Sequence, residues 1–275
     1  MLRRRSILPL LLFLSLAHGS FAQTQPTTAP AIEHSTYLLH LPGIGGLMNI
    51  DRLLTSGLLQ GGIEADLQIY DWTGPDRGLA SMTNVKRHEE QSQIVSRMIL
   101  QRHEQQPDGH IILTAHSAGT GVAVWALEKL PDEVMIDDLV LIASALSPEY
   151  DLSKALRHVR HKAYAFNSEL DVIVLGTGCR TFGTVDRVKT DAAGRVGFRV
   201  PDHPAVEGQY DKFIQYPYDP NWMQFRNNGE HIGPMMRPFA REVIALVILG
   251  RGPLPIPASQ PTTAPATGPA LKIPR

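Results

Sequence analysis

The sequence has only one cysteine, Cys179, among its 275 residues. A single cysteine excludes a disulfide within the chain, and its position excludes a lipid-modified cysteine at the end of an export signal. The chain also lacks an excess of either charge, with 26 basic and 27 acidic residues. This balance gives no indication of nucleic acid or an anionic surface as a partner. Stability must come from a hydrophobic core, and the chain is long enough to form one.

Apart from the N-terminus, no long apolar run is present. Residues 3–5 are arginines, and residues 7–17 form an apolar segment that is short for a membrane span. Small residues at Ser20 and Ala22 complete the pattern of a secretory signal. We expect residues 1–22 to be a signal peptide cleaved after Ala22, which gives a secreted or periplasmic protein without a stable membrane span. The alternative is an uncleaved membrane anchor. Cleavage would change the formal net charge from −1 to −4, because three arginines and no acids are lost.

Two segments have few large apolar side chains. The hexapeptide Pro-Thr-Thr-Ala-Pro-Ala occurs at 26–31 and again at 261–266. Such composition cannot offset the entropy of ordering the chain. We expect residues 23–34 and 253–275 to be disordered tails, on either side of one folded domain at 35–252.

The most informative stretch is residues 111–120, where a short apolar run stops at Ser117. An amphipathic segment, 122–130, follows at once. This order predicts a strand, a sharp turn and a helix, with the serine at the apex. Such a turn strains the serine backbone and needs small neighbours two residues before and after it, which Ala115 and Gly119 supply.

The stretch resembles the G-x-S-x-G nucleophile elbow of the α/β-hydrolase family, with Ala115 in place of the first glycine. The resemblance implies that Ser117 is a nucleophile. It also implies that the N–H of Ala118 stabilises a developing oxyanion. The alternative is a surface serine in a strand-to-helix turn of another α/β fold.

Strand-like and helix-like patterns alternate through the domain, which predicts βαβ units and a mostly parallel sheet. This agrees with an α/β-hydrolase-type, doubly wound α/β fold with helices on both faces. Residues 172–209 interrupt the alternation, and we interpret them as an insertion between the last two strands, with a hairpin around 191–194. The expected strands are 36–41, 65–72, 110–114, 139–143 and 162–166, and the expected helices are 47–59, 84–103, 122–130, 152–159 and 235–249.

A serine hydroxyl is a weak nucleophile and needs a histidine base, which in turn needs a carboxylate to orient it. In α/β-hydrolases the order along the chain is nucleophile, acid, histidine. Residues 163–174 resemble the family's late strand, polar turn and acid, which indicates Asp171 as the acid. Glu169 and Asp186 are the alternatives.

The histidine is expected in the loop before the closing helix, and His231 lies in such a loop at 227–234. His203 is the competitor, although no helix follows it. His116 adjoins the serine, and we expect its side chain to point away from the position of a base and to be structural.

A second oxyanion donor is expected from the loop after the first strand. The segment His-Leu-Pro-Gly-Ile-Gly-Gly at 40–46 resembles the corresponding loops of lipases and esterases. The resemblance implies that the N–H of Ile44 is the donor. A phosphate-binding turn is the rival interpretation, but the segment lacks both the G-x-G-x-x-G spacing and a Walker lysine.

Together these features predict an exported serine hydrolase that cleaves carboxylic esters through an acyl-enzyme on Ser117. The expected partner is a small-molecule or lipid ester, not nucleic acid, and no metal or organic cofactor is required. The same groups serve acyltransferases and thioesterases, so these activities remain open. A non-catalytic binding module of the cell envelope is the alternative of a different class. The sequence leaves the oligomeric state open.

Overall fold

The computed structural model describes residues 34–75 and 77–252. The predicted signal peptide (1–22), nearly all of the predicted linker, and the predicted tail (253–275) lie outside the described residues. None of the helices within the described ranges combines the length and apolar character that a membrane crossing requires.

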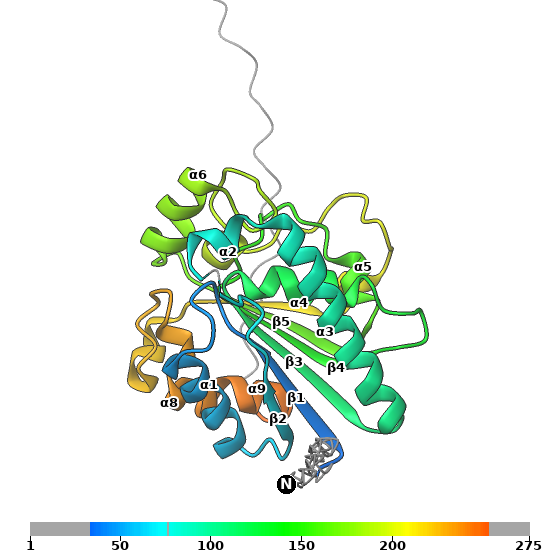
Figure 1. The fold of residues 1–275 in the computed structure, drawn as a ribbon. Helices are drawn as coiled ribbons and strands as arrows, with labels where there is room; N and C mark the ends of the chain where they lie inside the picture. The colour runs from blue at the N-terminus through cyan, green and yellow to red at the C-terminus, as the bar shows by residue number, and fades with distance from the viewer. Residues whose placement is uncertain (1–33, 76, 253–275) are drawn as a thin grey trace, which may run out of the picture. The chain divides into compact units, whose positions relative to one another are not determined.

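Within the described residues, six strands form one sheet in the order β2-β1-β3-β4-β5-β6 (Figure 1). Every neighbouring pair is parallel, so the prediction of an α/β fold with a parallel sheet is confirmed. The chain runs outward from β1 to β2 and then returns to β3, which creates a switch point between β1 and β3. In open parallel sheets ligands bind outside the carboxyl ends of the strands at such a point. The strands are β1 (Thr36–Leu41), β2 (Asp66–Ile69), β3 (His110–His116), β4 (Ile136–Ile142), β5 (Val159–Asn167) and β6 (Phe213–Pro217).

The central strands are buried on both faces. All seven residues of β4 and all but the first residue of β3 are buried. Strands covered on both faces have near-continuous apolar sequences, which explains why Ile111–Leu113 and Leu139–Ile142 show no polar alternation.

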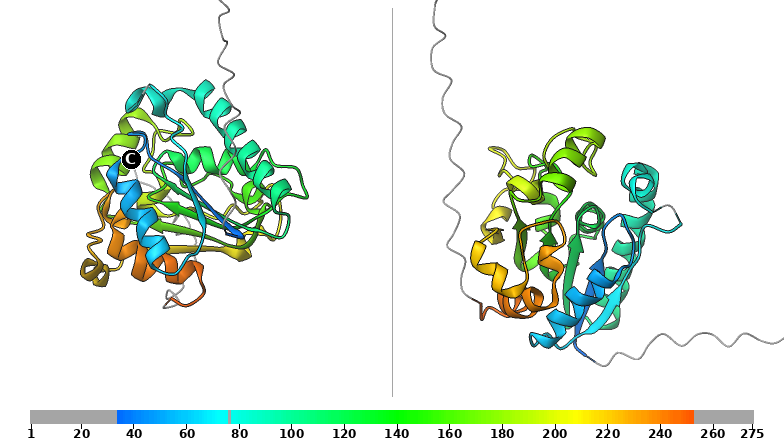
Figure 2. Two further views of the ribbon diagram at one scale, coloured as in Figure 1. Left: turned by 60° about the horizontal axis from the view of Figure 1, so that its bottom comes forward. Right: turned by 90° about the vertical axis from the view of Figure 1, so that its left-hand side faces the viewer.

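Helices cover both faces of this sheet. Helices α3 and α4 pack against each other, and α4 also packs against β1 and β3. Helix α1 packs against the closing helical segment, and Figure 2 shows the sheet between the two groups. The longer helices are α1 (Asn49–Gln60), α3 (Val85–Gln105) and α4 (Gly119–Leu127). The shorter ones are α2 (Leu79–Thr83), α5 (Ser153–Leu156), η1 (Val172–Gly178), α6 (Cys179–Phe182), α7 (Ala193–Val196), η2 (Gln209–Lys212), η3 (Pro220–Phe225), η4 (Gly233–Met235), α8 (Arg237–Phe239), η5 (Ala240–Ile244) and α9 (Ala245–Ile248).

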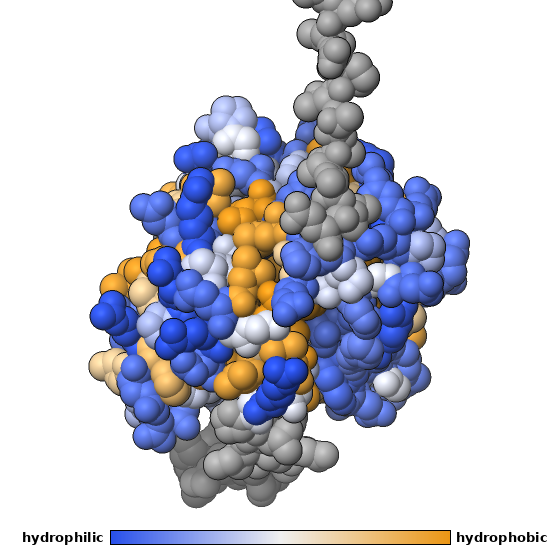
Figure 3. Space-filling model, turned by 90° about the horizontal axis from the view of Figure 1, so that it is seen from below, coloured by the Kyte–Doolittle hydropathy of each residue, from blue (hydrophilic) through white to orange (hydrophobic). Residues whose placement is uncertain are grey.

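Apolar side chains also reach the surface. The face seen from below has an apolar band bordered by polar residues (Figure 3). On the edge strand β2, Leu67 is 38% exposed. The domain therefore has apolar surface in addition to its buried core.

Several predicted elements differ from the structure. The hairpin expected around 191–194 is wrong, because α7 lies there. A Cβ on Gly194 would come within 2.3 Å of the backbone of Ala143 and Ser144, so this turn packs tightly against the end of β4. The helix expected at 152–159 is only α5, because β5 already begins at Val159.

Other differences concern the ends of elements. The strand expected at 65–72 is confined to β2, and the sequence pattern indicates no residue range for the strand after the insertion, which is β6. The closing helix contains a π-helical segment, η5, between α8 and α9. The interrupted region 172–209 does lie between the last two strands, β5 and β6.

Candidate active site

Ser117 lies directly after β3 with a φ of 54°, a left-handed backbone conformation that residues other than glycine rarely adopt. Its N–H donates to Ile142 at 2.9 Å. Its carbonyl accepts from the N–H of Thr120 at 3.1 Å, the hydroxyl of Thr120 at 2.6 Å, and the N–H of Ala145 at 3.3 Å. These bonds hold a strained turn that would otherwise relax, as is typical of functional backbone strain.

Gly119 explains why the turn needs small residues. A Cβ at this position would lie 2.3 Å from the carbonyl oxygen of Pro42 and 2.8 Å from that of Leu41. The start of α4 therefore touches the backbone of the loop that follows β1. Ala115 is fully buried at the end of β3, and its methyl group fits where the family pattern has glycine.

Three residues from distant parts of the chain form a line of hydrogen bonds. His231 Nδ1 lies 2.6 Å from Asp171 Oδ2, and His231 Nε2 lies 3.0 Å from Ser117 Oγ. An ionised carboxylate only accepts, so Nδ1 carries the ring proton. Nε2 is then free to accept the serine hydroxyl proton, which is the geometry that general base catalysis requires.

Both carboxylate oxygens of Asp171 have a hydrogen-bond partner. Oδ2 faces His231, and Oδ1 accepts from the N–H of Leu175 at 3.2 Å, so that Asp171, which is 3% exposed, caps η1.

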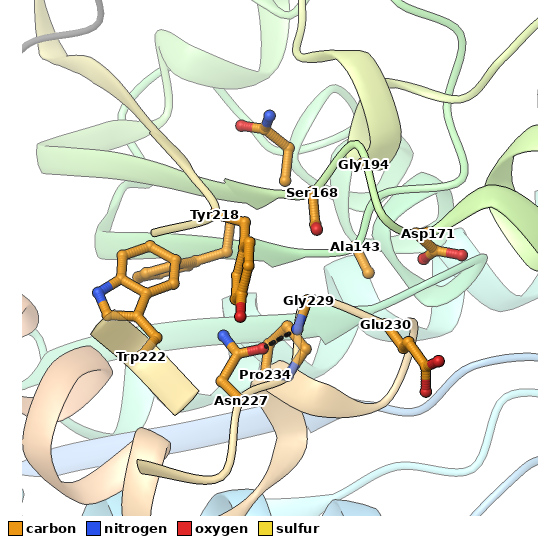
Figure 4. A pocket seen from close by; sticks show the side chains of 12 residues that line it. Ala143, Ser168, Asp171, Gly194, Tyr218, Trp222, Asn227, Gly229, Glu230 and Pro234 are labelled. Atoms are coloured by element: carbon orange, nitrogen blue, oxygen red, sulfur yellow. Dashed lines mark hydrogen bonds between the residues drawn. The ribbon is translucent and has the colours of Figure 1, made fainter. Parts of the chain in front are cut away.

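Figure 4 shows Asp171 at the border of a small cavity next to the loop that carries Glu230. In that loop, Asn227 Oδ1 accepts from the N–H of Gly229 at 3.0 Å. Ser117 is not among the residues that line this cavity.

The loop after β1 is held by its carbonyl groups. The indole N–H of Trp72 donates to the carbonyl of Pro42 at 2.7 Å. The carbonyl of Ile44 accepts from the N–H of Gly78 at 2.7 Å and from the hydroxyl of Ser81 at 3.3 Å. A fully buried tryptophan thus supports the loop, a role that its place in a strand-like sequence did not indicate.

An aspartate anchors the far end of the same loop. Asp71 Oδ2 accepts from the N–H of Leu47 at 3.0 Å, and Oδ1 accepts from the hydroxyl of Thr73 at 2.6 Å. Burial works against the charged carboxylate, but these hydrogen bonds outweigh it, so the pKa of Asp71 lies below its ordinary value. The carboxylate therefore stays ionised and keeps the loop fixed at neutral pH.

Two backbone N–H groups, one in the loop after β1 and one next to the serine in the chain, lack a partner in the part of the chain that the structure describes. Within 34–75 and 77–252, no acceptor is paired with the N–H of Ile44 or with that of Ala118. Buried backbone N–H groups are nearly always paired in folded proteins. The fully buried Ala118 is thus a donor without an acceptor at the position where an oxyanion would form.

The alternatives from the sequence do not reach the serine. Glu169 and His203 are exposed. Asp186 instead accepts from the N–H of Ser147 at 2.9 Å and from its hydroxyl. Of the residues considered as acid or base, the structure brings only Asp171 and His231 into the line that ends at Ser117.

Exposed apolar side chains flank the same residues along the chain. Leu170 and Val172 lie on either side of Asp171, and Ile173 is 82% exposed. Ile232 follows His231 and is also exposed. We call Leu170, Val172, Ile173, Val174 and Ile232 the apolar rim.

The described residues contain no group of three or more His, Cys, Asp or Glu side chains placed to hold a metal ion. The thiol of Cys179 is buried, and burial raises its pKa to about 12. The thiol of Cys179 therefore stays protonated at neutral pH and is a poor nucleophile.

No family model matches the sequence, and no curated protein matches it. Some solved structures are similar to the chain. One of two metagenome-derived lipolytic enzymes is 13% identical, with a TM-score of 0.47 over 80% of this chain and 94% of that chain. A lipase-esterase related protein from Clostridium acetobutylicum is 12% identical, with a TM-score of 0.43 over 79% and 95%. The type II thioesterase BorB from the borrelidin biosynthetic cluster is 13% identical, with a TM-score of 0.42 over 82% and 94%.

Likenesses this distant transfer no substrate or activity to the chain. The chain's own features are more specific: a fully parallel sheet, a switch point between β1 and β3, and a strained serine turn between β3 and α4. By these features the chain has an α/β-hydrolase-type fold.

Proposed function

We propose that the chain is a serine hydrolase that cleaves carboxylic esters through an acyl-enzyme. The observation that carries the proposal is the line of hydrogen bonds from Asp171 through His231 to Ser117, with donor–acceptor distances of 2.6 and 3.0 Å. A serine without an adjacent base would be a poor nucleophile. The strained turn and the unpaired N–H groups beside it support the same chemistry.

The reaction has two halves. In the first, Ser117 Oγ forms a bond to the acyl carbon while its proton passes to His231 Nε2. The carbonyl oxygen becomes an oxyanion, which the N–H groups of Ile44 and Ala118 bind. Asp171 stabilises the imidazolium. The tetrahedral intermediate then expels the alcohol oxygen, which takes the proton from His231.

In the second half, water replaces the alcohol. His231 removes a proton from the water while the water oxygen attacks the acyl carbon of the acyl-enzyme. The new tetrahedral intermediate releases the acid, and Ser117 Oγ regains its proton from His231. The apolar rim supports an uncharged, apolar acyl group or alcohol as the part of the substrate that lies outside the reacting bond.

The test is hydrolysis of a short and a long p-nitrophenyl ester by the full chain after removal of the predicted signal. Ser117→Ala and His231→Ala are compared with His203→Ala, in which an exposed histidine outside the site is changed. We expect turnover to disappear in the first two variants and to persist in the third. Turnover that survives in Ser117→Ala contradicts the nucleophile assignment.

A fluorophosphonate probe gives a substrate-independent measurement, because labelling requires an activated serine. Labelling without ester turnover would favour a thioester or acyl-transfer substrate. Neither labelling nor turnover would favour the binding-module alternative.

Export is part of the proposal. The basic, apolar and small-residue segments of 1–22 support cleavage after Ala22. N-terminal sequencing of the protein recovered outside the cytoplasm should give Gln23 as the first residue, and an intact N-terminus would contradict cleavage.

A further inference from the structure

His116, the last residue of β3, contacts the proposed base directly. Its ring lies beside that of His231, with the centroids 4.8 Å apart and the planes at 43°. Its Nε2 lies 3.2 Å from the main-chain carbonyl oxygen of His231. The hydrogen bond to the serine hydroxyl comes from His231 and not from His116, yet the His116 side chain is close to the site.

The hydrogen bond determines the tautomer of His116. A carbonyl oxygen only accepts, so Nε2 must carry the proton and Nδ1 must be the unprotonated nitrogen. Nδ1 is buried, and the described residues offer it no hydrogen-bond partner. On that side a Cβ added to Gly43 would lie 3.3 Å from Nδ1, which shows that the loop after β1 packs closely against the ring.

A second proton on this ring would be strongly unfavourable. It would create a buried N–H at Nδ1 without an acceptor. Burial, followed by the nearby His231 and His40, holds the pKa of His116 well below the ordinary histidine value. His116 therefore remains a neutral donor while His231 gains and loses its proton.

The loop that carries His231 alternates exposed and buried residues. Asn228, Glu230 and Ile232 are exposed, whereas Asn227, Gly229 and Gly233 are buried. Bonds inside the loop join its other residues, such as Gly233 N–H to the carbonyl of Glu230 at 2.9 Å. Within the described part of the chain, the hydrogen bond from His116 ties the backbone of His231 to the sheet.

We propose that His116 is a positioning residue for the reaction: its Nε2–H holds the main chain of His231 so that the imidazole lies between Asp171 and Ser117. This inference rests on the proposed function for its effect on turnover. Misplacing a reacting group by about 1 Å can lower a rate by about a hundredfold. The carbonyl of His231 is therefore an effective point of attachment, because it moves with the ring that transfers the proton.

The kinetic test compares His116→Phe with His116→Gln. Phenylalanine keeps an apolar ring against His231 but has no donor, whereas the glutamine amide can place an N–H near the position of Nε2. We expect kcat to fall by about ten- to a hundredfold in His116→Phe, with KM within about twofold of the parent. We expect His116→Gln to recover most of the loss. The rate of fluorophosphonate labelling should follow kcat.

Thermal unfolding of both variants separates positioning from a loss of folded protein. A parental kcat in His116→Phe, or an equal loss of kcat in both variants, would show that the hydrogen bond does not position the base.

A measurement without turnover distinguishes failure of this inference from failure of the proposed function. Nitrogen-15 NMR of the histidine rings in the full chain reports tautomer and charge. We expect His116 to be neutral with its proton on Nε2 at neutral pH, and His116→Phe to shift the ring signals of His231. A His116 proton on Nδ1, or an unchanged His231 spectrum in the variant, overturns the inference whatever the ester assays give.

Discussion

The ring proton of His231 depends on the carboxylate of Asp171, which lies 2.6 Å from Nδ1. An amide at position 171 can donate to Nδ1 and would favour the tautomer with the proton on Nε2. That tautomer cannot accept the hydroxyl proton of Ser117. We therefore expect Asp171→Asn to lower kcat by roughly 10⁴-fold while the protein remains folded.

The matched control for this change is Glu169→Asn. Glu169 is exposed two residues away on the same turn, and the hydrogen bonds of the His231 ring go to Asp171 and Ser117 instead. Ester turnover of the two variants, measured beside their circular dichroism spectra, decides the assignment. A similar loss in both variants would show that the turn, and not the Asp171 carboxylate, is what matters.

The close contact at Gly119 gives a second prediction. A methyl group there would meet the carbonyl oxygen of Pro42 at 2.3 Å, and backbone cannot move aside as a flexible side chain does. We expect Gly119→Ala to destabilise the domain by about 1–3 kcal/mol and to lower turnover, because α4 and the loop after β1 must separate.

The comparison for this change is Gly176→Ala, where the nearest atom lies 3.4 Å from the added Cβ. Urea unfolding and ester turnover are measured for both variants. A Gly119→Ala protein with the parental free energy of unfolding and parental turnover would mean that α4 and the loop after β1 are not in the close contact described.

Among the elements, η1 and its exposed side chains lead to a prediction about substrate range. Ile173 is 82% exposed, so its replacement by glutamate should leave the free energy of unfolding nearly unchanged. If the apolar rim binds the acyl chain, Ile173→Glu should raise KM about tenfold for a long p-nitrophenyl ester and have little effect on a short one.

Leu67→Glu serves as the control for surface charge. Leu67 is exposed on β2, and the strand register places it level with Ile112, five residues before Ser117. Equal effects of the two variants on long and short esters would exclude the rim from substrate binding.

The elements that the sequence predicts well are those with an unbroken apolar pattern. Residues 111–120 combine a buried strand, small residues and an apolar helix, so the turn at Ser117 could be placed without the structure. The positions of Asp171 and His231 could be expected from chain order, and the structure brings both to the serine. Their catalytic roles stay predictions.

The contacts that could not be predicted from the sequence join residues that are far apart in the chain. Trp72 supports Pro42 across 30 residues, and His116 donates to His231 across 115. Neither contact leaves a local pattern. The insertion was misread at 191–194 for the same reason, because the close approach of Gly194 to Ala143 decides its conformation.

At the scale of the whole molecule, three buried histidines determine how the free energy of unfolding changes with pH. His88, His116 and His158 are each buried, and each donates a ring N–H to a backbone carbonyl. Burial is the main cause that lowers the pKa of all three below the ordinary value of 6.5. In the unfolded chain the same side chains take up protons as the pH falls through that value.

Between the unfolded and folded pKa values the unfolded state therefore binds more protons, so the free energy of unfolding must decrease as the pH falls below 6.5. Burial raises the carboxyl pKa values of Asp138 and Glu128, so these two groups oppose the decrease in the free energy of unfolding at lower pH. We expect urea unfolding between pH 7.5 and 5.5 to show proton uptake that grows as the pH falls. His158→Asn keeps a donor for the carbonyl of Val134 but cannot titrate, so it should reduce this uptake. Stability that is independent of pH in this range would mean that the three rings are already protonated in the folded protein or are not buried in it.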